Sequence, residues 1–80
     1  MKYDEDFLDT CKKLGNNIQK FREEKQMTIK ELSEKTGIRK EYLRKIEDGK
    51  AYGVLFDKHL LKIAIALNIK ISSLFDFDFL

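Results

Sequence analysis

The stretch TIKELSEKTGIRKEYLRKIEDGK, residues 28–50, is the part of this 80-residue chain that most clearly indicates its fold. It opens with a helix start signal, because Thr28 can cap a helix and Glu31, three residues later, can reach back to close a capping box. Gly37 can end that helix, since glycine adopts the left-handed conformation of a C-terminal cap without a steric penalty. The sequence therefore predicts a short helix over residues 29–36.

A second short helix is predicted directly after this glycine. It spans about 40–48 and ends at Gly49 for the same reason as the first. This is the pattern of a helix-turn-helix, in which one short helix crosses the phosphate backbone and the next enters the major groove. We place the pattern at about 28–48. Apolar residues are placed to hold the two helices at a fixed angle: Leu32, Ile38, Leu43 and Ile46.

Helical periodicity also precedes this pattern. Apolar residues recur there at steps of three and four, which places them on one helical face: Phe7, Cys11, Leu14, Ile18 and Phe21. We expect this helix to end near Lys25 and to begin between Asp6 and Lys12. Its start is uncertain because Gly15 costs about 1 kcal/mol inside a helix.

After the pattern, residues 50–56 are expected to form a loop. A further helix is predicted at about 58–67, with Asp57 as its cap and Asn68 at its end. A last short helical turn would carry Leu74 and Phe75. Because proline is absent and glycine is scarce, these elements point to an all-α protein.

Length and composition exclude several classes of protein. Eighty residues suffice for one domain, 1–80, with one small core. The single cysteine, Cys11, and the single histidine, His59, provide no metal-ligand set, so neither a metal nor another cofactor is expected. No apolar run is long enough to span a bilayer, and the N-terminus lacks a signal-peptide pattern. We therefore expect a cytoplasmic protein that is not an enzyme and does not bind membranes.

The charges are unevenly distributed along the chain. The net charge is only +2, but residues 1–10 carry −3, whereas residues 12–50 carry twelve Lys or Arg against seven Asp or Glu. A basic central region is what a phosphate-binding surface needs.

Two stretches resemble a known family. LGNNIQKFREEKQMTIKELSEKTGIRKEYLRKIEDGK, residues 14–50, is similar to the lambda-repressor-like, or Cro-type (XRE), helix-turn-helix domain. HLLKIAIALNIKISSLF, residues 59–75, resembles the last two helices of that domain. The resemblance implies five helices within a core of residues 14–75, followed by a tail at 76–80. It also implies that the second and third helices bind DNA.

Carried over by position, the resemblance assigns three groups of residues. It implies DNA base contacts from Lys40, Glu41, Tyr42 and Lys45. It implies DNA phosphate contacts from Thr28, Lys30, Arg39, Arg44, Lys50 and Tyr52. A partly buried ion pair between Arg22 and Glu47 is expected to be structural. Two alternatives stay open: Glu41 can simply pair with Lys45, and Tyr42 can pack on a neighbouring helix.

Three features depart from the family pattern. Ile29 stands where glutamine is frequent, and Arg39 stands where Ser or Thr usually caps the recognition helix. The loop after Gly49 is longer than usual and lacks the common proline.

The resulting hypothesis is a sequence-specific transcriptional regulator that binds double-stranded DNA as a homodimer. Two recognition helices would then read a palindromic operator in major grooves about 34 Å apart. The apolar C-terminus would supply the dimer interface: Leu74, Phe75, Phe77, Phe79 and Leu80. The alternative is a protein-interaction module, such as an antitoxin or a bridging cofactor, whose C-terminal tail binds a partner protein such as a toxin or polymerase.

Overall fold

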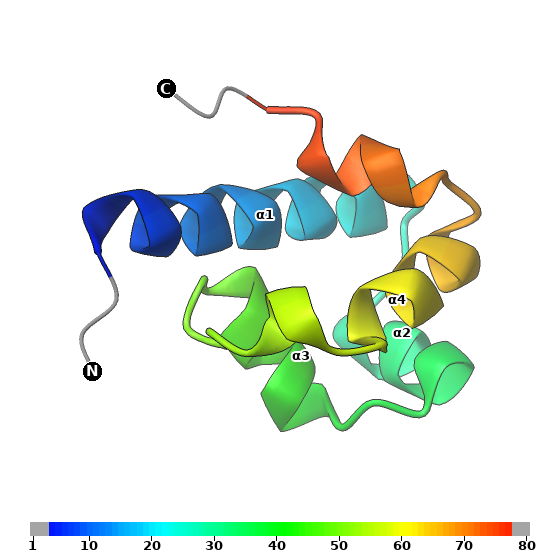
Figure 1. Cartoon of the computed structure of the whole chain (residues 1–80). Coiled ribbons are helices and arrows are strands. Elements are labelled where there is room, and N and C mark those ends of the chain that lie inside the picture. Colours follow the sequence, from blue (N-terminus) through cyan, green and yellow to red (C-terminus); the bar gives the residue numbers. More distant parts are fainter. Residues whose placement is uncertain (1–3, 78–80) are drawn as a thin grey trace.

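In the computed structural model, residues 4–77 are described, and every element among them is helical (Figure 1). The α-helices are α1 (Glu5–Glu24), α2 (Ile29–Thr36), α3 (Lys40–Glu47) and α4 (His59–Leu67). Two short 3-10 helices complete the fold: η1 (Val54–Phe56) and η2 (Ile71–Phe75). The prediction of an all-α fold is confirmed. The expected fifth α-helix is replaced by the 3-10 helix η2.

Helix α1 starts earlier than the sequence predicted. The carboxylate of Asp4 accepts a hydrogen bond from the backbone N–H of Phe7 at 2.8 Å, so the helix begins at Glu5 rather than between Asp6 and Lys12. Gly15 lies in the helix interior because α1 passes very close to the end of α3 there. A Cβ atom at this position would overlap the carbonyl oxygen of Ile46 and lie 2.6 Å from that of Glu47.

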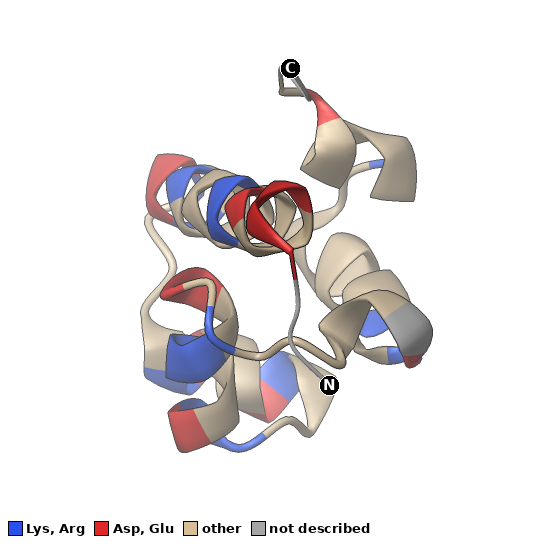
Figure 2. Cartoon of the chain, turned by 60° about the vertical axis from the view of Figure 1, so that its left-hand side comes forward, with Lys and Arg blue, Asp and Glu red and all other residues tan. Residues whose placement is uncertain are grey.

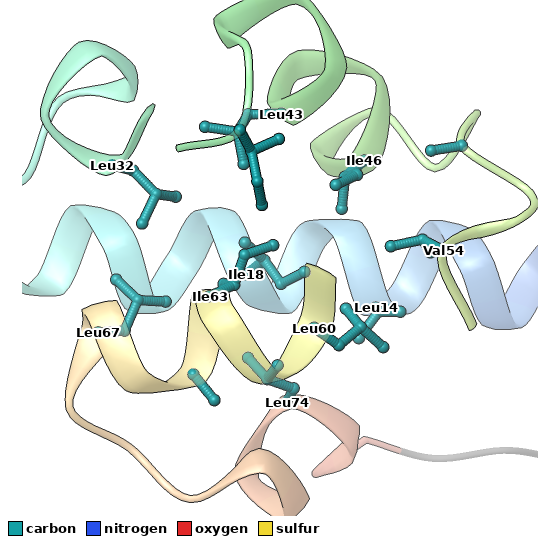
Figure 3. Packing of buried hydrophobic residues seen from close by; sticks show 13 residues of the cluster. Leu14, Ile18, Leu32, Leu43, Ile46, Val54, Leu60, Ile63, Leu67 and Leu74 are labelled. Atoms are coloured by element: carbon teal, nitrogen blue, oxygen red, sulfur yellow. The ribbon is translucent and has the colours of Figure 1, made fainter. Parts of the chain in front are cut away.

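The core forms where the four α-helices converge (Figure 3). Leu14 and Ile18 of α1 are fully buried between the other helices. The four residues that were predicted to hold the helix-turn-helix together are all buried, which confirms their assignment: Leu32, Ile38, Leu43 and Ile46. Helix α4 contributes one buried face: Leu60, Ile63, Ala64 and Leu67.

The segment between α3 and α4 is more ordered than the loop that was expected at 50–56. Ala51 and Val54 are buried in the core, and residues 54–56 form η1. Gly49 adopts φ +75°, as a helix-ending glycine should, and also lies against the backbone of Lys12 in α1. The segment between α3 and α4 is therefore packed against the core and does not project into solvent as a free loop.

Residues 71–77 pack onto the rest of their own chain, and they include three residues of the predicted dimer interface. Leu74 is fully buried in the core, and the side-chain amide of Asn17 donates to the carbonyl oxygens of Ser73 at 3.1 Å and Leu74 at 2.9 Å. The 3-10 helix η2 packs against both α1 and α4, and Leu74 is its buried residue. Phe75 and Phe77 are half-buried against this core. Phe79 and Leu80 lie outside the described residues.

Candidate nucleic-acid interface

The start of α2 is held by a reciprocal pair of hydrogen bonds. The hydroxyl of Thr28 accepts from the backbone N–H of Glu31, and the Glu31 carboxylate accepts from the backbone N–H of Thr28, both at 3.0 Å. The predicted capping box is therefore confirmed. The hydrogen bond from the Thr28 backbone N–H to the carboxylate, and secondly the Thr28 side chain beside that carboxylate, lower the pKa of Glu31. The positive end of α2, where an anion is favoured, is thus exposed and well ordered.

The turn between α2 and α3 is fixed by hydroxyl groups as well as by glycine. Gly37 adopts φ +75°. The hydroxyl of Thr36 donates to the Leu32 carbonyl oxygen at 2.7 Å and accepts from the Ile38 N–H at 3.1 Å. The hydroxyl of Ser33 donates to the Ile38 carbonyl oxygen at 2.5 Å. Sequence reasoning missed both hydroxyls, although Ser and Thr next to a helix end often bind local backbone groups.

Helix α3 has one buried side and one exposed side. Leu43, Ile46 and Glu47 face inward. Three of the four residues that were predicted to contact bases are exposed: Lys40, Glu41 and Lys45. Within residues 4–77, Glu41 and Lys45 form no ion pair with each other, so the carboxylate and the ammonium group each face solvent. Figure 2 shows Lys and Arg interspersed with Asp and Glu on the helix-turn-helix, whereas the first turn of α1 is acidic.

Tyr42, the fourth predicted base-contacting residue, lies differently. Its side chain is half-buried, and its hydroxyl lies 3.4 Å from a carboxylate oxygen of Asp57. Its ring is tilted against the ring of His59, with 5.0 Å between the centroids. Burial, together with the nearby Asp57 charge and hydrogen bond, raises the pKa of Tyr42. These contacts match the alternative in which Tyr42 packs on a neighbouring helix.

The residues that were predicted to contact phosphate belong to the start of α2, to the start and the body of α3, and to the segment that follows α3. Five of them are exposed and one, Tyr52, is half-buried: Thr28, Lys30, Arg39, Arg44, Lys50 and Tyr52. Arg39 is the N-cap of α3, and its side chain makes no capping hydrogen bond. The start of α3 therefore has a cationic side chain at a position where a Ser or Thr would otherwise bind the backbone.

Arg22 and Glu47 lie together and join three parts of the fold. The Arg22 Nε donates to Glu47 Oε2 at 2.8 Å, Nη2 donates to Oε1 at 3.1 Å, and Nη1 donates to the carbonyl oxygen of Met27 at 2.8 Å. The side chains are only 11% and 7% exposed. The hydrogen bond to Glu47 is the main cause of a raised pKa for Arg22. This pair ties α1 and the following turn to the last residue of the exposed helix α3.

Residues 4–77 contain no cluster of three or more His, Cys, Asp or Glu side chains that could hold a metal ion. The helices of the same residues are too short or too polar to cross a membrane.

Helix α3 has a buried side that is fixed by the core and an exposed polar side. The short helix α2 and a tight turn precede it. This arrangement defines a helix-turn-helix DNA-binding domain. Residues 17–79 match the family described as Cro/C1-type HTH DNA-binding domain, and the chain belongs to this family. The resemblance inferred from the sequence is thereby confirmed. Comparison with curated proteins and with solved structures gave no match.

Proposed function

We propose that this protein is a transcriptional regulator that binds specific DNA sequences through α3. The observation that supports this most directly is the exposure of Lys40, Glu41 and Lys45 on a helix whose opposite side is buried. Lysine ammonium groups can donate to guanine O6 and N7, and a glutamate can accept from cytosine N4. An orientation that is fixed by Leu43, Ile46 and the Arg22–Glu47 pair lets these groups reach base edges as one rigid set.

The phosphate contacts follow from the same placement. Arg39 and Arg44 flank the exposed side of α3, and Lys50 follows its end. Thr28 and Lys30 stand at the positive end of α2, where a phosphate group is stabilised. With Tyr52 from the following loop, these residues position the protein on the duplex, while the base contacts supply the sequence preference.

We further propose that two copies bind a palindromic operator. One short recognition helix contacts few base pairs, and two copies would read half-sites about 34 Å apart on one face of the duplex. Because Leu74 is fully buried within one copy, we do not include it in the proposed contact between copies. Phe75 and Phe77, half-buried beside it, remain the described candidates for that contact.

The test is to titrate the protein against random-sequence duplex DNA at two salt concentrations, and then to select preferred sequences from a randomised pool. Affinity should fall steeply with salt, and the selected sequences should contain two inverted half-sites. Replacing Lys40 and Lys45 with glutamine should relax the sequence preference at the positions that they contact, at a cost of about 1–3 kcal/mol for each lost contact.

A matched control removes the same charge from another side of the molecule. Lys20 is an exposed residue of α1 beside Asp76 and Phe77, and Lys70 is exposed just before η2, which lies on the opposite side of α1 from α3 (Figure 1). The double change of Lys20 and Lys70 to glutamine should therefore leave the selected sequence and its affinity nearly unchanged. Weak binding of the unaltered protein at both salt concentrations would contradict the proposal and favour a protein-interaction module.

A further inference from the structure

The carboxylate of Asp57 lies where the start of α4 meets α3. One oxygen accepts a hydrogen bond from the backbone N–H of His59 at 2.9 Å. The other oxygen lies 3.4 Å from the Tyr42 hydroxyl and 2.8 Å from Nδ1 of the His59 ring. The ring nitrogen is at ion-pair distance but is not aligned for a hydrogen bond. Asp57 therefore contacts α3 and α4 at once.

Capping of α4 explains only half of these contacts. The bond to the His59 N–H serves the first residue of α4, although the N-cap of this helix is Lys58 and not, as the sequence predicted, Asp57. The contact with Tyr42 does nothing for α4, because Tyr42 belongs to α3. Helix α3 packs mainly on α1 and α2. Its contact with the start of α4 is made by Tyr42, which touches Asp57 and the His59 ring.

The start of α3 needs such a connection for a physical reason. The helix has only eight residues, and its N-cap Arg39 makes no side-chain hydrogen bond. Uncapped ends of short helices fray. Base readout requires that side chains be held within about half an ångström of their working positions. Lys40 and Glu41 lie in this first turn, two residues and one residue before Tyr42, respectively.

We propose that Asp57 is a positioning residue, which fixes the first turn of α3 by holding the Tyr42 hydroxyl beside the His59 ring. On this view Tyr42 serves DNA recognition through Asp57, and its hydroxyl does not itself contact a base. The inference rests on the proposed function, because the first turn of α3 needs positioning for DNA only if α3 reads DNA.

A double-mutant cycle tests this on the sequences selected from the randomised pool. Tyr42→Phe removes only the hydroxyl and keeps the ring against His59, whereas Asp57→Ala removes the carboxylate. Each change should lower the ratio of selected-sequence affinity to random-duplex affinity by about fivefold to tenfold, as expected for one lost hydrogen bond. The double variant should be no worse than either single variant, because both remove the same contact. Thermal melts establish that each variant is folded.

Asp57→Asn is the matched control for charge. It removes the same negative charge as alanine but can still accept from the His59 N–H and bind the Tyr42 hydroxyl, so it should restore most of the specificity ratio. Equal effects of Asn and Ala would show that the charge of Asp57 acts on DNA directly and would overturn the proposal. A loss for Tyr42→Phe without a loss for Asp57→Ala would also overturn it, since Tyr42 would then contact DNA itself.

A measurement without DNA separates this inference from the proposed function. Amide hydrogen exchange in the first turn of α3 should be faster in Tyr42→Phe and in Asp57→Ala, by a similar factor, while exchange in α2 stays unchanged. Unchanged exchange in α3 would contradict the positioning role even if the protein binds DNA. Failure of the unaltered protein to bind DNA would contradict the proposed function. The hydrogen-exchange rates of α3 in the two variants would then still show whether Asp57 fixes the first turn of α3.

Discussion

Gly15 occupies the point where α1 crosses the end of α3. In an isolated helix this glycine would lower stability by about 1 kcal/mol relative to alanine. In the folded chain it permits a backbone approach that no side chain allows, since the nearest atoms are the carbonyl oxygens of Ile46 and Glu47. The same approach brings Glu47 within reach of Arg22. Gly15, which has no side chain, thus determines how closely α1 and the end of α3 can pack.

Gly15→Ala should therefore destabilise the protein despite its better helix propensity. The added Cβ would meet backbone atoms that cannot rotate away, so α1 and α3 must separate. Overpacking of this kind lowers the free energy of unfolding by about 1–3 kcal/mol. Urea unfolding measures the change. Gly53→Ala is the control, because that glycine has φ −83° and open space around its Cα, and it should be neutral or slightly stabilising. Equal stability of Gly15→Ala and the unaltered protein would refute the close approach.

Residues with local roles could be predicted from the sequence, and residues with distant partners could not. The capping box and the turn glycine depend on neighbours a few residues away, so their patterns were visible. Arg22 and Glu47, 25 residues apart, were paired only through the family resemblance. Asn17 contacts Ser73 and Leu74 across more than fifty residues, and nothing in the local sequence indicated this.

Among the elements, α2 is short enough for its capping to matter. It has eight residues, and its first turn is closed by the Thr28–Glu31 box. Short helices gain most of their stability from packing and from their ends, because nucleation is unfavourable. Its exposed start is also the place where the proposed function puts a phosphate group. The box therefore supports both the helix and the candidate interface.

The capping box makes stability depend on pH. The bonds from Thr28 lower the pKa of Glu31 in the folded state relative to the unfolded chain. Their contribution is therefore complete above the ordinary glutamate pKa and is lost as the pH falls through the folded-state value. In thermal melts from neutral to acidic pH, Glu31→Gln should have a lower melting temperature than the unaltered protein at neutral pH. The gap should close in acid.

A glutamate on the same helix but outside the box provides the comparison. Glu34 is exposed on α2 and takes no part in the box. The gap between Glu34→Gln and the unaltered protein should be small and should not close in the same way. Parallel melting curves for Glu31→Gln and the unaltered protein across this pH range would show that the carboxylate bonds add nothing to stability.

At the scale of the whole molecule, the helix-turn-helix, which carries both basic and acidic residues, and the acidic first turn of α1 lie on different parts of the surface (Figure 2). Periodicity predicted which residues of α3 face inward, so the exposure of Lys40, Glu41 and Lys45 could be anticipated. The position of Tyr42 could not, because its partner Asp57 stands in a segment whose path depends on the buried Ala51 and Val54. The same limit applies to the C-terminus, where apolar residues alone did not distinguish self-packing from an interface.

Leu74→Ala decides between these two roles of the C-terminus. Leu74 is fully buried beside α1 and α4, whereas Ile65 on α4 is 70% exposed. Truncating a buried leucine lowers the free energy of unfolding by about 2–5 kcal/mol. Truncating an exposed one changes it by about 0.5 kcal/mol or less. Urea unfolding at several protein concentrations should therefore show that Leu74→Ala unfolds earlier at every concentration and that Ile65→Ala does not. If Leu74 instead joined two copies, Leu74→Ala would weaken the association of the copies but leave each chain folded. The stability would then fall only at protein concentrations at which the unaltered protein is a dimer.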